Sequence, residues 1–186
     1  MSTRQASSVA TDILRREHML ILRVAGALER MHCMDPLPLD DIDLAAMFCR
    51  LYTDSCHHGK EEDLLFAALE DADGSPAGDL VAALRDEHVE GRRLVGVMVR
   101  AIARVRAGDA REEPALRDAM RDYVALIRGH ILKEDDGLFE VADGVIRGAA
   151  CDHLCAAYET VCARRFEGHS AADLQELGES LVARYR

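Results

Sequence analysis

Apolar residues recur at three- and four-residue spacing along most of the chain, a pattern that predicts a series of long amphipathic helices. Proline, glycine and aspartate separate the apolar stretches and predict short turns between the helices. The second helix begins at Asp40 or Asp41, and Ser75 followed by Pro76 resembles the cap and first residue of the third. The four predicted helices span residues of about 8–31, 40–72, 77–107 and 114–143.

Four long helices with short connections predict an all-α fold, an antiparallel up-down-up-down four-helix bundle that occupies residues 1–147. Beyond the bundle, weaker periodicity predicts two shorter helices, at about 151–166 and 171–186, with Ser170 as the cap of the last. We expect residues 148–186 to form a C-terminal helical extension that packs on the bundle.

The composition agrees with a helical chain and excludes several kinds of partner. Tryptophan is absent and aromatic residues make up only 4% of the sequence, whereas alanine, leucine, arginine and glutamate abound. With 34 acidic and 23 basic residues the net charge is -11, so we expect no nucleic-acid or membrane partner. No apolar run approaches the roughly 18 residues of a membrane span and no signal peptide is evident, which predicts a cytoplasmic protein with six reduced cysteines.

Two segments built around histidine occur twice, about seventy residues apart. Leu-Arg-Arg-Glu-His at 14–18 returns as Leu-Arg-Asp-Glu-His at 84–88, and a His-x-x-x-Glu segment with a following Leu-Phe occurs at 57–66 and again at 130–139. Each copy offers one lone histidine and one histidine with a glutamate four residues later. The candidate metal ligands are His18, His57, Glu61, His88, His130 and Glu134.

This spacing suits metal binding because residues four apart on an α-helix lie about 40° apart around the axis and about 6 Å apart along it. A histidine and a glutamate at that spacing can therefore share one ion. Neutral imidazole nitrogens together with carboxylate oxygens suit iron, manganese or zinc, and a carboxylate can bridge two ions through its two oxygens. Four imidazoles and two carboxylates predict a centre of two transition-metal ions.

The order of these motifs resembles the hemerythrin-like family, also called the HHE cation-binding domain. The resemblance rests on the Glu-His pairs at 17–18 and 87–88 and on the two His-x-x-x-Glu segments. It implies a non-heme di-iron centre with an oxo or hydroxo bridge inside a four-helix bundle. By the same resemblance His18 and His130 would bind one iron, His57 and His88 the other, and Glu61 and Glu134 would bridge them.

One departure from the family and two ambiguities affect the ligand set. Oxygen-carrying hemerythrins have a further histidine where this chain has Arg92, so four histidines would leave open coordination positions, which favours redox chemistry over simple oxygen carriage. His58 and Glu62 satisfy the same spacing as His57 and Glu61, and the apolar stripe centres on them. The repeat nevertheless favours His57, which leaves His58 and Glu62 in the surrounding shell. Asp135 competes in the same way with Glu134.

Other residues near the predicted centre have more than one reading. Tyr123 lies two turns before His130 on nearly the same face, either to donate to a metal-bound ligand or to make a structural hydrogen bond. Glu17 and Glu87 either orient histidines of neighbouring helices or are solvated. Cys56 adjoins His57 in the sequence. Three further cysteines share one helical face, where they are either small buried side chains or a thiol cluster: Cys151, Cys155 and Cys162.

The leading hypothesis from the sequence is a cytoplasmic di-iron protein that binds or reduces oxygen, hydrogen peroxide or nitric oxide. The alternative is a non-catalytic iron-binding or oxygen-sensing module, and a metal-free helical interaction protein is a third reading. The sequence leaves open which of these holds, and with it enzyme activity, the electron donor and the oligomeric state.

Overall fold

The computed structural model describes residues 9–71 and 77–186, and within these residues it is all-helical, as predicted, with no β-strand. An isolated β-bridge joins Phe166 and His169. The predicted turn at 73–76, with Ser75 and Pro76, lies outside the described residues. The α-helices are α1 (Val9–His32), α2 (Leu39–Phe48), α3 (Phe66–Glu70), α4 (Gly78–Arg106), α5 (Glu113–Lys133), α6 (Phe139–Val145), α7 (Ala149–Cys162) and α8 (Ala171–Arg184).

Three segments that the sequence predicted as α-helix are wound as π-helix: η1 (Cys49–His58), η2 (Glu61–Leu65) and η4 (Glu134–Leu138). A short 3₁₀-helix, η3 (Ala110–Glu112), precedes α5. The π-segments do not interrupt their helices, so α2 continues through η1, η2 and α3, and α5 continues through η4 and α6. Because π-turns are uncommon and concentrate at functional sites, their presence in both copies of the repeated segment marks these places as special.

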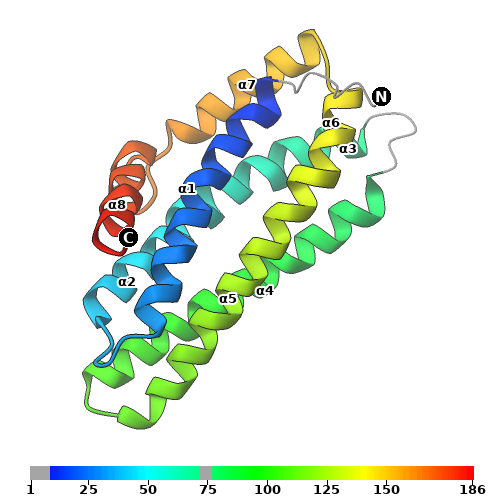
Figure 1. Ribbon diagram of the computed structural model, residues 1–186. Helices are drawn as coiled ribbons and strands as arrows, with labels where there is room; N and C mark the ends of the chain where they lie inside the picture. The colour runs from blue at the N-terminus through cyan, green and yellow to red at the C-terminus, as the bar shows by residue number, and fades with distance from the viewer. Residues whose placement is uncertain (1–8, 72–76) are drawn as a thin grey trace.

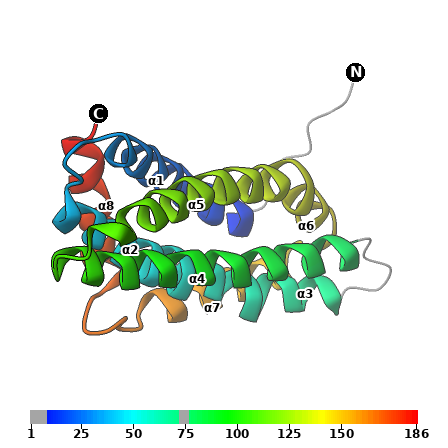
Figure 2. The ribbon, with the colours of Figure 1, turned by 90° about the horizontal axis from the view of Figure 1, so that it is seen from below.

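The long helices lie side by side in two layers. Figure 2 shows α1 and α5 in one layer and α2 and α4 in the other, and contacts join α1 to α5, α4 to α5 and α2 to α4. The two C-terminal helices cover one side, where α7 and α8 pack along α1 and α8 also contacts α2 (Figure 1). Within the described residues, no helix has both the length and the apolar character that a membrane crossing requires.

Local signals explain several helix ends. Ser170 and Asp173 form a capping box at the start of α8, as the sequence predicted, with the Ser170 hydroxyl accepting from the Asp173 amide and the Asp173 carboxylate accepting from the Ser170 amide. Pro114 lies in the first turn of α5, where its missing N–H is not needed. After α4 the chain turns at Gly108, whose φ of 94° suits glycine.

Two apolar clusters form the core, one at each end of the long helices. One contains the repeated leucines and phenylalanines, each fully buried: Leu14, Leu65, Phe66, Leu84, Leu138 and Phe139. The other surrounds Leu28, Phe48, Met98 and Met120. Burial of each such side chain contributes about 1.5–3 kcal/mol, so the clusters hold the helices firmly on both sides of the gap between them. The repeated histidines lie in that gap.

Candidate metal centre

Five imidazoles and two carboxylates converge between the two apolar clusters. All six predicted ligands are there, and the structure adds His58, which the sequence placed in the surrounding shell. The contributing elements are α1 (His18), η1 (His57 and His58), η2 (Glu61), α4 (His88), α5 (His130) and η4 (Glu134). Each of these residues is at most 5% exposed, and both glutamates are at 0%. Such a concentration of buried polar groups requires a physical reason.

The residues form two groups that share a carboxylate. In the first group, His18, His57, Glu61 and Glu134 bring one ligand atom each within 4.8 Å of the others, and in the second His58, Glu61, His88 and His130 do the same. Glu61 belongs to both, with Oε1 3.3 Å from His57 Nε2 and Oε2 3.7 Å from His88 Nε2. The geometry therefore provides two adjacent positions for a cation with a carboxylate between them.

Glu134 also reaches both groups. Its Oε2 lies 3.2 Å from His18 Nε2, and its Oε1 lies 3.3 Å from His130 Nε2. The neighbouring Asp135 instead contacts the outer nitrogen of His18, and its side chain is 34% exposed. The structure therefore places Glu134, and not Asp135, between the two groups.

Four of the histidines are oriented by an outer carboxylate. Since a carboxylate only accepts, each Nδ1 donates to it and each Nε2 is left facing inward. Glu62, which the sequence placed in the surrounding shell, takes this role, and so do Glu17 and Glu87, for which the sequence left this role and solvation open. The pairs are His18 with Asp135 (3.0 Å), His57 with Glu17 (2.8 Å), His88 with Glu62 (2.7 Å) and His130 with Glu87 (3.0 Å).

A lysine completes two of these pairs in the same way in both copies of the repeat. Lys60 donates to the Glu17 carboxylate and Lys133 donates to the Glu87 carboxylate. The surroundings differ, because the Lys60 side chain is fully buried and that of Lys133 is 48% exposed. Burial of Lys60 follows from the C-terminal extension, since Cys162 at the end of α7 lies against it.

Comparison with known proteins agrees with this geometry. The profile of the hemerythrin HHE cation binding domain matches residues 9–142, which include every residue of the two groups. The chain belongs to the hemerythrin HHE cation-binding family. No solved structure matches the chain.

Curated relatives of this hemerythrin-like chain include an uncharacterized protein of Mycobacterium bovis and two of Mycobacterium tuberculosis. Each is 25% identical over 161 residues, which cover 84% of this chain. The chain spans 62% of the length of these relatives.

The inward-facing atoms of the hemerythrin-like site fit a metal cation. Within residues 9–71 and 77–186, no hydrogen bond is made by Nε2 of His18 or His57, by either nitrogen of His58, or by the carboxylate oxygens of Glu61 and Glu134. Leaving a buried polar atom unsatisfied costs about 1–3 kcal/mol, more if it is charged. Lone pairs on nitrogen and oxygen that converge without donors are the arrangement that a transition-metal ion satisfies.

The pKa shifts reflect the same crowding of acids and imidazoles. Burial lowers the pKa of His18, but the Asp135 and Glu134 carboxylates outweigh it and raise this pKa well above its usual value. Burial raises the pKa of Glu61, yet His57 and His18 bring it well below its usual value. His58 differs, since burial and the adjacent His88 hold its pKa well below its ordinary value. His58 therefore stays neutral, the form in which imidazole binds metals.

Two expectations differ from this geometry: the pairing of histidines that the resemblance implies, and the count of four imidazoles that the repeat gives. The histidines pair differently from the expected assignment: His18 lies with His57, and His88 with His130, whose Nε2 atoms are 3.0 Å apart. The position of a histidine in the repeat does not specify which histidine of a neighbouring helix lies at the same level along the bundle. The repeat therefore could not predict which histidines share a group. The count of imidazoles is also five and not four, because His58 supplies one.

Arg92 occupies the place of the family's additional histidine and makes ion pairs there. Its guanidinium donates to Asp54 (2.7 Å) and to Glu62 (2.6 Å), the carboxylate that orients His88. The signal for His58 was present in the sequence as the competing register. A purely α-helical interpretation forced a choice between His57 and His58, whereas the π-wound segment buries both.

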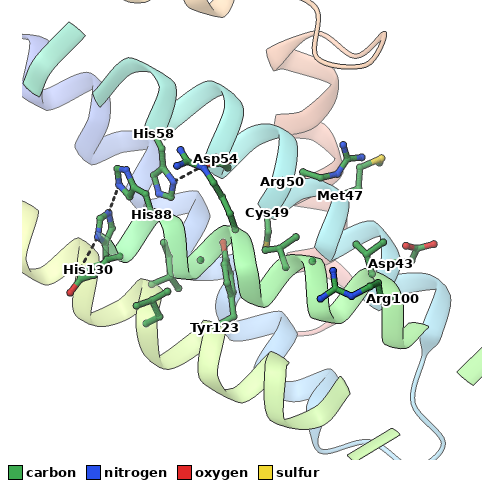
Figure 3. A pocket seen from close by; sticks show the side chains of 18 residues that line it. Asp43, Met47, Cys49, Arg50, Asp54, His58, His88, Arg100, Tyr123 and His130 are labelled. Atoms are coloured by element: carbon green, nitrogen blue, oxygen red, sulfur yellow. Dashed lines mark hydrogen bonds and ion pairs between the residues drawn. The ribbon is translucent and has the colours of Figure 1, made fainter. Parts of the chain in front are cut away.

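A pocket of about 460 Å³ leads to the second group from the surface. Figure 3 shows His58, His88 and His130 at its inner end, with Arg100 and Asp43 at the far end. Between them its walls come from α2, η1, α4 and α5 and include Gly91, Val95, Leu126 and Ile127.

Tyr123 lines the middle of this pocket (Figure 3). It is 4% exposed, and its hydroxyl lies beside Cys49 and Thr53. Burial, together with the Cys49 thiol, raises the pKa of Tyr123 well above its usual value. The structural reading of this tyrosine is therefore favoured over direct contact with a metal-bound ligand.

Proposed function

We propose that this hemerythrin-like chain binds two non-heme iron ions and uses them to bind or reduce a small oxidant: oxygen, peroxide or nitric oxide. The observation that carries the proposal is the pair of buried ligand groups that share Glu61. We further propose that α1, α4 and the long helices 39–70 and 113–145 form an antiparallel up-down-up-down bundle, with residues 148–186 as an extension. Contacts between neighbouring helices support this topology.

In the proposed centre His18 and His57 would hold one ion, and His58, His88 and His130 would hold the other. Glu61 and Glu134 would serve both ions, since each carboxylate reaches both groups. Bound iron would supply electrons to a small oxidant. The protein supplies the fixed ligand geometry, because the outer carboxylates hold four imidazole rings with Nε2 inward. The same nitrogen and oxygen donors accept manganese or zinc, so the metal is itself a measurable part of the proposal.

Access to the centre is unequal. The pocket reaches only the second group, and its apolar middle, with Val95, Leu126 and Ile127, favours passage of small neutral molecules. Neither His18 nor His57 of the first group lines this pocket. We therefore propose that an external ligand approaches the ion held by His58, His88 and His130.

The decisive experiment is metal analysis of the full-length chain purified anaerobically and reconstituted with ferrous iron. We expect two iron ions per chain, and a visible spectrum characteristic of a bridged di-iron centre once oxygen or peroxide is added. Sustained turnover of peroxide or nitric oxide would identify an enzyme, and stoichiometric binding alone would identify the non-catalytic module. A chain that retains no transition metal after reconstitution would refute both.

A variant at the pocket wall tests the route of access separately from metal binding. A Cβ added at Gly91 would lie 3.7 Å from the Leu126 side chain, an ordinary contact, so Gly91→Leu should extend into the pocket without disturbing the helices. Gly144→Leu, at an exposed position of α6 where nothing lies within 4 Å of the added Cβ, is the matched control. We expect Gly91→Leu to keep its iron and react more slowly with peroxide, whereas an unchanged rate would contradict entry through this pocket.

A further inference from the structure

The buried lysine near the first group has an unusual neighbourhood. Lys60 Nζ donates to Glu17, lies 3.7 Å from the Cys162 sulfur and is 6.0 Å from the centre of the Tyr158 ring. Both Cys162 and Tyr158 belong to α7, so the C-terminal extension supplies this side of the environment. The equivalent Lys133 has no such cover, as its side chain is 48% exposed. The extension thus adds a thiol next to a buried cation in only one copy of the repeat.

A second thiol completes the arrangement. Cys56 at the end of η1 is 1% exposed and belongs to the larger apolar cluster, against which the half-buried Cys162 packs as its neighbour. The sequence grouped Cys162 with Cys151 and Cys155 on one helical face, but in the structure its partner is Cys56. Two thiols from segments about a hundred residues apart therefore meet beside an ammonium group.

Position distinguishes the two sulfurs. Cys162 is the more accessible of the two, and Lys60 Nζ lies 3.7 Å from its sulfur. The neighbouring Cys56 thiol lowers the pKa of Cys162, burial opposes this, and the Lys60 ammonium adds to the lowering. A thiolate is the nucleophilic form of cysteine, so the more accessible of the two sulfurs is also the more reactive.

We propose that Cys162 and Cys56 form a redox-active dithiol that reacts with hydrogen peroxide and closes to a disulfide between α7 and η1. The Cys162 thiolate attacks one peroxide oxygen, so that an S–O bond forms, the O–O bond breaks, and hydroxide leaves and is protonated to water. The Cys56 sulfur then attacks the resulting sulfenic acid, so that the S–S bond forms, the S–O bond breaks, and a second water departs with the Cys56 proton. Two thiols lose two electrons, and one peroxide gains them.

The chain contains a matched comparison on the same helix. Cys155 is half-buried, like Cys162, and lies one helical turn from a second thiol, that of Cys151. Its charged neighbours are Asp152 and Glu159 in place of a lysine, and burial, followed by Cys151, raises its pKa. If proximity of two thiols were sufficient for reactivity, this pair would react as readily as the first.

The test is cysteine mapping of the full-length chain, both as purified and after removal of metal with a chelator. With one equivalent of hydrogen peroxide we expect a cross-linked peptide that joins Cys56 to Cys162, with both thiols recovered after reduction by dithiothreitol. At pH 7 iodoacetamide should label Cys162 on the order of tenfold faster than Cys155, because the larger thiolate fraction outweighs the lower nucleophilicity of each thiolate. Reaction in the chelated protein separates this proposal from that of the iron centre.

Variants assign the two roles. Cys56→Ser should let a sulfenic-acid probe accumulate on Cys162, Cys162→Ser should abolish the reaction, and Cys155→Ser should leave it unchanged. Lys60→Met should slow labelling of Cys162, with circular dichroism to verify folding, and the cysteine variants decide the proposal without it. A cross-link mapped chiefly to Cys151 and Cys155, or equal labelling of Cys155 and Cys162, would overturn the proposal.

Discussion

Replacement of His58 by alanine distinguishes most directly between the ligand set that the structure indicates and the one that the sequence repeat predicts. Sequence repetition predicts that metal loss follows His57, and that His58 is dispensable. The structure places the two side chains in different groups, with His57 beside His18 and His58 beside His88 and His130. We therefore expect His57→Ala and His58→Ala each to lose about one of two iron ions, and from different positions.

The effect of His58→Ala on stability should depend on whether metal is bound. In the metal-free protein both nitrogens of His58 are buried without hydrogen bonds, although Nδ1 lies 3.5 Å from an Asp54 carboxylate oxygen, and removing such atoms relieves at most about 1–3 kcal/mol. The space left behind joins the pocket that His58 already lines, so the cavity cost is smaller than in a sealed core. We expect metal-free His58→Ala to be about as stable as the metal-free parent, within about 1 kcal/mol.

With iron present the variant should be markedly weaker. An ion at a hundred times its dissociation constant stabilises the folded chain by about 2.7 kcal/mol, which the variant forfeits at one position. For a chain of this size that corresponds to a melting temperature lower by about 5–11 °C. The stacked contact with His88, whose ring centre lies 3.8 Å from that of His58, is lost in both states and cancels from the comparison.

Two measurements test this prediction: elemental analysis of bound metal, and thermal unfolding monitored by circular dichroism. Each is made in the presence of iron and in the presence of chelator. His153→Ala, an exposed histidine on α7, is the matched control and should behave like the parent in all four measurements. The reasoning fails if His58→Ala keeps two ions and the full metal-dependent rise in melting temperature. It also fails if His57→Ala alone removes both ions.

Three further predictions concern the surrounding structure. In the metal-free protein Glu17→Gln should lower the free energy of unfolding in urea by about 3–5 kcal/mol, because the fully buried Lys60 ammonium loses its carboxylate partner. Glu87→Gln should lower it by less than about 1 kcal/mol, since the Lys133 side chain that it pairs with is half exposed. Gly178→Ala should cost about 1–3 kcal/mol by the same measurement, because its Cβ would lie 2.6 Å from an aromatic carbon of α2. Leu65→Ala should cost about 2–5 kcal/mol and Leu64→Ala clearly less, since only Leu65 is fully buried; equal losses would contradict the helix register.

The all-helical class and the bounds of the long helices were predictable because long helices leave a strong periodic signal. The first helix was expected at 8–31 and is found at Val9–His32, and the third was expected at 77–107 and is found at Gly78–Arg106. The cap at Ser170 followed from a local rule that needs only residues 170–173. Both kinds of signal depend on neighbours in sequence, which is why they survive without knowledge of tertiary contacts.

The candidate site was predictable as a set of residues, and less so as a geometry. Duplication identified six side chains that the structure brings together, but it could not pair them, since pairing depends on the relative heights of different helices. It also could not place His58. The repeat favoured His57 and the apolar stripe favoured His58. This conflict is explained by the π-helical segment η1, in which both side chains are buried.

The duplicated sequence predicts two equivalent halves, and the structure departs from equivalence in a consistent direction. His58 has Ile131 as its counterpart, so the additional imidazole falls in one group only. The pocket opens to that same group, while α7 covers Lys60 on the side of the other. One group is therefore rich in histidine and lines the pocket, and the other is linked through Glu17 and Lys60 to a thiol. Since ligand type and access control the chemistry of a bound metal, two ions held by this chain would differ in reactivity although their ligands arose from one repeated motif.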